Sequence, residues 1–571
     1  MTRSVGTRHE LRGDLVSRSP LHIGGWEPSP LADLTVARDG SGRPFIPGTS
    51  LAGALRGWLA GQGVDDRLLF GWIKGQDGVA SRIRLDDAPL LGDPDRTSVR
   101  TGVGIDRHTR SAARGFLYER EVLPAGTRFA FRLVADEPHP ADPSSAGSAD
   151  ADAVGAAVEQ LTRALRAGHV ALGAGRSRGF GEVNLENATL RTTDLSTRPG
   201  LIAWLTGTSP WRALTDDPET PHPGRLTVTV DWRPLTPLLV KDASSGARID
   251  MLPLTSADAD GTKVRLLLPG SSVKGVLRDH AERIVRTLTR APAPGHLAET
   301  LDQEDLPGVT TLFGRSPRRR PDRAPRTDVS SGWRGALECT DCHSLGHLSA
   351  EDWNAVVTAR AAPAPARSGS LAAPGRPGAA GRPDRDARRA ERQAASAARR
   401  NERQATRQYL DSLADQDGGL ALHIADHVAV DRWTGGARDQ ALFSVLEPIG
   451  TAWEPLRLHV DCRRASGPAK GADGDSVSLA LLLLVLRDLA DGWLGFGFGV
   501  TRGQGQLTVS QVRFEGTDVP EPWASLVRAG TLDTVLADPP SAVAAALDAW
   551  SSHLSDPVLT LTHTAVEEAA R

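Results

Sequence analysis

The sequence predicts an α+β protein built from two tandem copies of one folded unit, and three observations support this. The chain has 571 residues, more than a single hydrophobic core normally accommodates. Its composition, 39% hydrophobic and 24% charged, is typical of globular proteins and excludes collagen-like, coiled-coil and wholly disordered chains. Finally, one series of motifs occurs twice in the same order, with a period of roughly two hundred residues.

The first part of each copy predicts a strand, a loop that contains an aspartate, a short strand and an amphipathic helix. The helix opens with Pro-Gly-Thr-Ser at residues 47–50 and with Pro-Gly-Ser-Ser at residues 269–272. An arginine, Arg56 or Arg278, follows about two turns later in each helix. Free N–H groups at a helix start favour an anion, so the recurrence predicts phosphate binding there, with plain N-capping as the alternative.

The second part of each copy predicts strands and a glycine-rich loop. The segment IDRHTRSAARGFLYEREVLPAGT corresponds to VDRWTGGARDQALFSVLEPIGT. Asp106 lies 72 residues before Arg178 in one copy, and Asp431 lies 71 residues before Arg502 in the other. Coincidence does not explain this ordered agreement, so we infer a duplication.

The glycine-rich loops, residues 173–181 and 495–505, offer backbone that a ligand can approach closely. Arg176, Arg178 and Arg502 supply positive charge in these loops. Neither loop ends in Gly-Lys-Ser/Thr, so neither is a nucleotide-binding P-loop.

Strand, helix and further strands, repeated twice, fit a split-βαβ, ferredoxin-like unit. Such sheets often bind single-stranded RNA through exposed aromatic rings, but aromatic residues make up only 5% of this chain. Contact with the sugar-phosphate backbone is therefore favoured. A net charge of −3 leaves RNA binding open, because 62 of the 67 basic residues are arginine and are clustered.

The repeat and the composition predict the domain boundaries. The first domain is expected at residues 1–200, a linker at 201–222, the second domain at 223–519 and a helical tail at 520–571. An insertion at about 361–407, rich in Arg, Ala and Pro, is interpreted as a disordered loop with a helix possible from about residue 386 to 410. The alternative is an electrostatic arm for RNA.

Other features narrow the cellular context and the metal chemistry. No run of eighteen apolar residues is present, no charged-then-apolar leader opens the chain, and three cysteines cannot build a disulfide framework. A cytoplasmic protein without membrane contact is expected. Cys339 and Cys342, followed by His343 and His347, invite zinc, but a predicted strand there would put the two thiols on opposite faces. Buried structural cysteines are favoured over zinc.

The two series of motifs, from the Pro-Gly-Ser/Thr-Ser helix start through the Ile-Asp-Arg-x-Thr block to the glycine-rich loop, resemble the RAMP superfamily of CRISPR-associated proteins. The resemblance covers about residues 8–190 and, more divergently, 224–512. It is strongest to the backbone subunits of type III (Csm/Cmr-type) interference complexes, and the fused pair is similar to type III-D backbone proteins. The resemblance implies modified ferredoxin-like (RRM-like) domains, each with a β-hairpin thumb.

The resemblance also implies functional residues. The thumbs would span residues 102–127 and 427–451, with His108, Thr109, Trp433 and Thr434 near their tips. Catalytic aspartates that cut target RNA would be Asp33 and Asp250. The implied RNA-binding residues are Ser50, Arg56, Arg107, Arg176, Arg178, Ser272, Lys274, Arg278, Arg432 and Arg502.

The second copy departs from the family pattern near its aspartate. Asp250 precedes Pro269 by 19 residues, whereas Asp33 precedes Pro47 by 14. Asp242, Asp258 and Asp260 therefore compete with Asp250 for the role. The first copy departs too, because Ala52 stands where the second has Lys274.

One carboxylate can suffice to cut RNA, because the 2′-hydroxyl is a built-in nucleophile and the protein need only splay the strand and supply a base or a metal anchor. A hydrated Mg²⁺ held by the carboxylate and phosphate oxygens suits this arrangement. The implied partners are CRISPR RNA, target RNA and the other type III subunits, including RAMP subunits, a small subunit and the polymerase/cyclase large subunit.

Two other functions remain open at this stage. One is a non-catalytic double-RAMP end cap that grips RNA and neighbouring subunits. The other is a guide-processing endoribonuclease, for which His22 and His280 are the candidate catalytic histidines.

Overall fold

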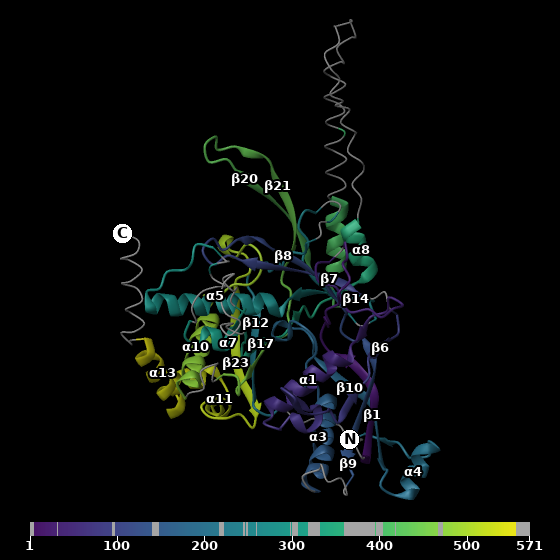
Figure 1. The fold of residues 1–571 in the computed structure, drawn as a ribbon. Helices are drawn as coiled ribbons and strands as arrows, with labels where there is room; N and C mark the ends of the chain where they lie inside the picture. The colour runs from purple at the N-terminus through teal and green to yellow at the C-terminus, as the bar shows by residue number, and fades with distance from the viewer. Residues whose placement is uncertain are drawn as a thin grey trace.

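The chain folds into two adjoining α+β domains, the first purple to blue and the second teal to yellow in Figure 1. The computed structural model describes residues 5–30, 32–93, 97–139, 148–215, 222–243, 246, 249–258, 260–296, 299, 306–317, 332–358, 394, 404–416, 418–465 and 472–554.

The first domain has the β-α-β-β-α-β order of a ferredoxin-like fold. Its main antiparallel sheet runs β10-β1-β9-β5, which are the fourth, first, third and second of these strands in chain order. The elements are β1 (Val5–Ser17), α1 (Gly48–Gly61), β5 (Ile83–Leu85), β9 (Arg128–Pro138), α3 (Ser148–Arg166) and β10 (Val183–Asp194).

Sequence periodicity explains how these elements form one core. Phe129, Phe131 and Leu133 alternate along β9, so they share the face of the sheet that packs against the helices. Leu51 and Leu55, one turn apart, present one apolar face of α1 to the same cluster.

The second domain repeats this arrangement strand for strand. Its sheet runs β23-β12-β22-β17, again the fourth, first, third and second main strands. The elements are β12 (Arg225–Pro234), α5 (Gly270–Thr289), β17 (Leu337–Cys339), β22 (Leu456–Asp461), α10 (Ala472–Ala490) and β23 (Leu507–Thr517). The predicted α+β class and the pair of ferredoxin-like units are confirmed.

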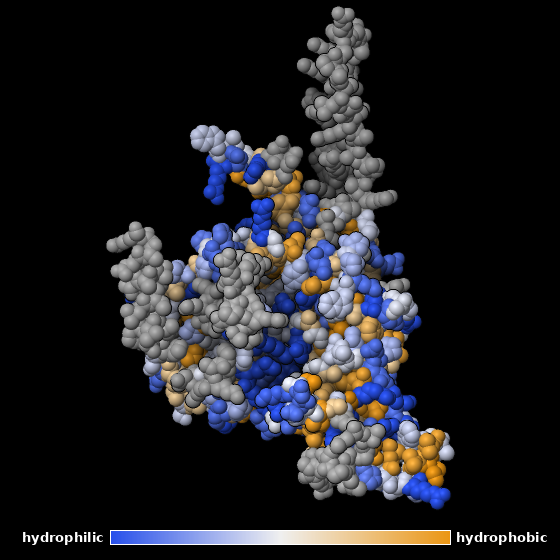
Figure 2. Space-filling view, in the orientation of Figure 1, coloured by the Kyte–Doolittle hydropathy of each residue, from blue (hydrophilic) through white to orange (hydrophobic). Residues whose placement is uncertain are grey.

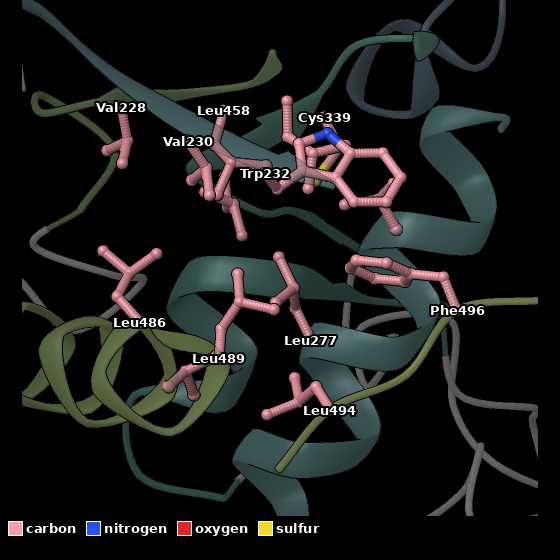
Figure 3. Packing of buried hydrophobic residues seen from close by; sticks show 14 of the residues in the cluster. Val228, Val230, Trp232, Leu277, Cys339, Leu458, Leu486, Leu489, Leu494 and Phe496 are labelled. Carbon is pink, nitrogen blue, oxygen red and sulfur yellow. The ribbon is translucent and has the colours of Figure 1, made fainter. Parts of the chain in front are cut away.

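The core of the second domain lies between this sheet and its two helices (Figure 3). Trp232 of β12 and Cys339 of β17 face Leu277 of α5, and Leu489 of α10 closes the cluster from the other helix. Phe496, at the start of the glycine-rich loop, meets Trp232 edge-on with ring centroids 6.2 Å apart. The loop is thereby anchored to the core.

Smaller elements are also duplicated. In each copy a short strand before the helix pairs with a short strand after the second main strand, β2 with β6 and β14 with β18. A one-turn helix follows α1 and α5. These elements are β2 (Phe45–Ile46), α2 (Arg67–Phe70), β6 (Ala88–Leu91), β14 (Lys263–Leu268), α7 (Val309–Phe313) and β18 (Cys342–His343).

Further short elements decorate the two domains. They are β3 (Trp72–Lys74), β4 (Asp77–Val79), β13 (Thr255–Ala257), β15 (Gly314–Arg315), β16 (Trp333–Arg334), β19 (Leu348–Ser349) and α8 (Ala350–Thr358).

Each domain extends a long β-hairpin, which we call the first and second thumb. The first thumb is β7 (Ser98–Ile105) with β8 (Ala112–Val122), and the second is β20 (Leu422–Val430) with β21 (Ala437–Pro448). Both begin several residues before the expected positions, 102 and 427. The first thumb crosses α5 of the second domain, whereas the second thumb projects away from the body of the molecule (Figure 1).

Residues expected in a linker belong in part to the first domain. β11 (Arg212–Ala213) pairs with β10 at the edge of the first sheet. Trp211 beside it contacts the guanidinium groups of Arg12 and Arg191, 4.6 and 4.4 Å from its ring centroid. The helix before it, α4 (Arg198–Leu205), spans the expected boundary at residue 200. Its exposed Leu and Ile side chains form the apolar surface at the lower right of Figure 2.

The tail is helical as predicted and packs on the second domain. It forms α11 (Ala524–Ala529), α12 (Leu532–Ala537) and α13 (Ser541–Leu554). Val543 and Trp550 of α13 are buried in the second core. These two side chains hold α13 against the second domain. Residues 555–571 lie outside the described residues.

Most of the expected insertion also lies outside the described residues, which resume continuously at 404 with a helix through 414. Among the described residues, no helix is long and apolar enough to span a membrane.

Candidate RNA interface

Asp33 and Asp250 occupy equivalent positions at the roots of the two thumbs. Each carboxylate accepts a backbone N–H from the C-terminal strand of its own thumb. Oδ2 of Asp33 lies 2.8 Å from Glu119 N of β8, and Oδ2 of Asp250 lies 2.8 Å from Ser444 N of β21. The residue after each aspartate forms a parallel bridge with the same strand, Leu34 with β8 and Met251 with β21.

The backbone hydrogen bonds around the two aspartates match as well. Leu34 N donates to Glu119 O at 3.0 Å, and Met251 N donates to Ser444 O at 3.1 Å. The carbonyl of Leu34 accepts from Glu121 N, as the carbonyl of Met251 accepts from Leu446 N. The two loops therefore dock on the thumbs in one register, despite their different spacing from the helix.

The three competing aspartates of the second copy lie elsewhere. Asp258 and Asp260 sit in the turn between β13 and β14, where they accept hydrogen bonds from Thr262 and Lys263. Asp242 lies on the opposite side of the loop, with its N–H bonded to Leu252 O. Only Asp250, among these four aspartates, reproduces the contact that Asp33 makes.

Both carboxylates are exposed, and each uses only Oδ2 for its hydrogen bonds to the thumb. No cluster of three or more His, Cys, Asp or Glu that could hold a metal was found in the described part of the chain. Each aspartate can therefore provide one oxygen ligand to a hydrated Mg²⁺, which would draw its other ligands from water and RNA phosphate.

In both thumbs an aspartate stabilises the turn at the tip through the same backbone hydrogen bonds. Asp106 Oδ1 accepts the N–H groups of His108 and Thr109, both at 2.9 Å. Asp431 Oδ1 accepts those of Trp433 and Thr434, at 3.0 and 2.8 Å. These bonds lower the pKa of Asp431, with the bond from the Thr434 N–H as the largest cause. The aspartate of the Asp-Arg-x-Thr block thus fixes the turn.

The residues at the two tips have different surroundings. Arg107 of the first thumb lies over α5 of the second domain, with Nε 3.3 Å from Glu282 Oε2. Its counterpart Arg432 is exposed, and Trp433 beside it is 96% exposed. His108, Thr109 and Thr434 are also exposed.

A cavity of about 480 Å³ lies beside the contact of Arg107 with Glu282 and is lined by the first thumb tip and the C-terminal half of α5. Arginines outnumber carboxylates around it, which suits a phosphate group. Its charged lining is Arg107, Arg110, Asp279, Glu282, Arg283, Arg286 and Arg290.

The glycine-rich loops have the same backbone in both copies. Positive φ angles of 80° at Gly175 and 90° at Gly179 flank a 3-10 turn, as do angles of 78° at Gly499 and 85° at Gly503. Side chains other than glycine adopt such angles with difficulty, which explains the conserved spacing of glycines between the copies.

The arginines of the two glycine-rich loops differ in exposure. Arg176 and Arg178 of the first loop are half-buried, whereas Arg502 of the second is exposed. The first loop packs against the start of α5, so that burial and nearby Arg334 lower the pKa of Arg176 to about 10. Arg178 reaches toward Tyr118 of the first thumb, 3.5 Å from its hydroxyl. Arg502 is exposed and rests over the ring of Phe498, 4.8 Å from its centroid.

The predicted phosphate sites at the two helix starts are occupied by protein carboxylates. Gly48 N donates to Asp87 Oδ1 at 2.7 Å, and Gly270 N donates to Asp341 Oδ1 at 2.9 Å. A phosphate at these positions would meet a negative charge. The hydroxyl groups of the two starts do not cap the helices either, because the N-cap residues are Pro47 and Pro269 and neither makes a side-chain cap hydrogen bond. Ser50 and Ser272 lie in these first turns and are half-buried.

Asp341 also joins the two domains. Its Oδ2 lies 2.5 Å from Nη1 of Arg100 on the first thumb, and its side chain is only 5% exposed. Asp87, its counterpart in the first copy, is exposed. Asp87 and Asp341 are the third residues of two segments that correspond between the copies, LDDAPL at 85–90 and CTDCHSL at 339–345, so the repeat could have identified both. No local pattern in the sequence marks Arg100 as the partner of Asp341 or as a junction residue.

The cations predicted along the helices are largely engaged within the protein. Arg56 pairs with Asp66, and Arg278 pairs with Glu282 at 2.8 Å. Lys274 donates to Leu337 O at 2.7 Å, and burial lowers its pKa to about 8. Its ammonium group is therefore buried inside the second domain.

Of the histidines and cysteines singled out from sequence, His22, His280, Cys339 and Cys342 are buried, whereas His343 and His347 are half-buried. His22 Nδ1 lies 2.7 Å from Glu121 O, and His280 Nε2 lies 2.6 Å from Asp488 Oδ2. Burial lowers the pKa of His22 and raises that of the Cys339 thiol to about 12. Cys342 donates to Glu454 O from a different short strand.

Comparison with known families identifies both copies. The model of the RAMP superfamily matches residues 14–184 and 233–508, which together contain both aspartate loops, both thumbs and both glycine-rich loops. No curated protein matches the chain. With two matched regions that coincide with its two ferredoxin-like domains, the chain belongs to the RAMP superfamily, which indicates a CRISPR-associated, RNA-binding subunit.

Proposed function

We propose that this protein is a backbone subunit of a type III CRISPR effector that acts in the cytoplasm. In this proposal it binds CRISPR RNA and cuts the complementary target RNA beside Asp33 and beside Asp250. The observation that carries the proposal is the equivalent placement of these two carboxylates at the roots of two thumbs. Hairpins that long are suited to splaying a nucleotide out of a duplex.

The chemistry required of the protein is modest. The 2′-hydroxyl oxygen next to the scissile phosphate attacks phosphorus, and the 5′-oxygen of the following nucleotide leaves. The attacking hydroxyl loses a proton to a base and the leaving oxygen gains one, with a 2′,3′-cyclic phosphate and a 5′-hydroxyl as products. An exposed carboxylate that the thumb holds through Oδ2 is suited to take that proton directly or through water.

A divalent cation fits these positions, because each aspartate is exposed and has a second oxygen available as a ligand. When bound, Mg²⁺ would neutralise charge on the phosphate during the attack. Asp33 and Asp250 would each hold it by a single oxygen.

The second domain offers the more accessible surface for RNA. Arg432, Trp433 and Arg502 are exposed on its thumb and glycine-rich loop. Arginines there suit phosphate groups, and the tryptophan suits a base that has been splayed out. Other RAMP subunits, a small subunit and a polymerase/cyclase subunit are the proposed protein partners.

The test is cleavage of a labelled RNA complementary to the guide by the reconstituted complex, with Mg²⁺ or EDTA. The double variant Asp33→Ala/Asp250→Ala should lose cleavage by at least about 100-fold while keeping its affinity for guide and target RNA. Asp260→Ala is the matched control, because this aspartate is also exposed but lies in the turn between β13 and β14, where it accepts the Thr262 N–H.

Cleavage that persists in the double variant would overturn the nuclease proposal. The non-catalytic end cap would then account better for the engaged cations of the first copy. Loss of both cleavage and RNA binding would point to a structural role for the two aspartates.

A further inference from the structure

Trp26 is the most exposed large hydrophobic side chain among the described residues, at 101% relative accessibility. Removing the large apolar surface of a tryptophan from water is favourable, so a ligand that covers this exposed ring would be stabilised by the contact. It lies in the loop that carries Asp33.

Backbone pairing places Trp26 beside the candidate catalytic aspartate. Gly24 forms an antiparallel bridge with Val36, and Gly25 N donates to Thr35 O at 2.8 Å. Trp26 directly follows this pairing, and the same register continued by one residue would place it opposite Leu34, the neighbour of Asp33. Thr35 Oγ1, bonded to Glu27 O at 2.8 Å, holds the two sides of the loop together beyond that step.

The second copy has the same ladder without the aromatic residue. Lys241 bridges Pro253, and Asp242 N donates to Leu252 O at 2.9 Å. The residue opposite Met251, beside Asp250, is therefore Ala243. The two candidate sites share their aspartate and their backbone but differ at this position.

We propose that Trp26 is a positioning residue that stacks on a nucleobase of the RNA strand at Asp33, and that this contact distinguishes the first site from the second. The inference rests on the proposed function, because it assigns Trp26 to the RNA that Asp33 would cut. Every base offers a flat aromatic face, so such stacking tolerates any sequence. A base held there keeps its neighbouring phosphate near the Asp33 carboxylate.

The first measurement uses RNA with 2-aminopurine next to the first cut, bound by the reconstituted complex in an Asp33→Ala background. Stacking quenches this fluorescent base whether or not cleavage occurs. Quenching should fall in Trp26→Ala and return in Trp26→Phe. Equal fluorescence in all three complexes would overturn the proposal, even if cleavage itself depends on Asp33.

The second measurement is the cleavage rate with Asp33 intact. Trp26→Ala should slow the first cut on the order of ten-fold and leave the second unchanged. An abasic nucleotide at the stacked position should slow the wild type to the same rate and not slow Trp26→Ala further. Additive effects of the two changes would contradict stacking.

The outcomes separate this inference from the proposed function. Cleavage that does not depend on Asp33 defeats the nuclease, while the fluorescence still decides whether Trp26 stacks on RNA. If Trp26→Ala instead prevents a neighbouring subunit from joining and leaves fluorescence unchanged, Trp26 is a protein contact and the inference is wrong.

Discussion

In the first domain the thumb and the glycine-rich loop lie against α5 of the second domain, whereas the same two elements of the second domain are exposed. Arg100 and Arg107 of the first thumb pair with Asp341 and Glu282. At the tip of the second thumb, Arg432 and Trp433 lie in solvent.

This difference shows that one motif can serve two purposes in one chain. The first copy uses its arginines to join the domains, and the second keeps Arg432 and Arg502 accessible. The aspartate loops do not share this asymmetry, because Asp33 and Asp250 are both exposed at a thumb root. In the proposed function, the two domains would therefore differ in their accessible arginines but not in their exposed aspartates.

The largest expected effect comes from breaking the junction. Asp341→Ala should lower the free energy of unfolding by about 3–5 kcal/mol, because it leaves the nearly buried guanidinium of Arg100 without its carboxylate. It also removes the acceptor for Gly270 N. Urea denaturation measures the change.

Asp87→Ala is the matched control for the junction. It removes the same helix cap from the first copy, where the carboxylate is exposed. Its cost should be about 1 kcal/mol, as for an ordinary cap. Equal costs for the two variants would contradict the assignment of Asp341 to the junction.

A second effect concerns Lys274, whose counterpart in the first copy is Ala52. Burial lowers the Lys274 pKa from 10.5 to about 8 in the folded protein. Between these values the unfolded chain binds the proton more tightly, so wild-type stability should rise with pH through this window. Below pH 8 the charged form is present in both states, and the folded state bears the full cost.

Lys274→Met removes this titration. Its stability advantage over wild type should be constant below about pH 8 and should shrink by about 3 kcal/mol as the pH approaches 10.5. Urea denaturation at several pH values measures the difference, and Ala52→Met serves as the control without a titrating group. A difference that does not change with pH would refute the buried ammonium.

The smallest effect distinguishes the two glycine-rich loops. Arg502→Ala should reduce the salt dependence of single-stranded RNA binding by about 0.7 in the log–log slope, the loss of one phosphate contact. Arg178→Ala should leave the slope unchanged, because this side chain lies at the domain junction. Fluorescence anisotropy titrations at several salt concentrations measure both, and equal slopes would contradict the comparison.

Much of the fold could be predicted because it depends on local pattern and repetition. The alternation of β9, the four-residue spacing in α1 and the duplicated motif order suffice to indicate two α+β units. The correspondence of Asp250 with Asp33 was predicted from motif order, although Asp242, Asp258 and Asp260 competed for the position. Only the docking of each loop on its thumb distinguishes them.

The rest depends on contacts between segments far apart in sequence. Arg100 and Asp341 are separated by 241 positions, and no local pattern marks either as a junction residue. The family resemblance implies that Lys274, which lies in an amphipathic helix, is an accessible cation that binds RNA. The packing of β17 against α5 buries it instead. The two helix starts have the residues of a phosphate site. In each, however, the first N–H binds an aspartate that follows the second main strand of the same domain, Asp87 after β5 and Asp341 after β17.

The most direct test of the central claim is to map the cuts made by each single aspartate variant. Asp33→Ala and Asp250→Ala, in the same reconstituted complex and with the same target RNA, should each abolish one cut and leave the other. If either variant abolishes both cuts, or if neither changes the pattern, the two aspartates are not equivalent and independent cleavage sites.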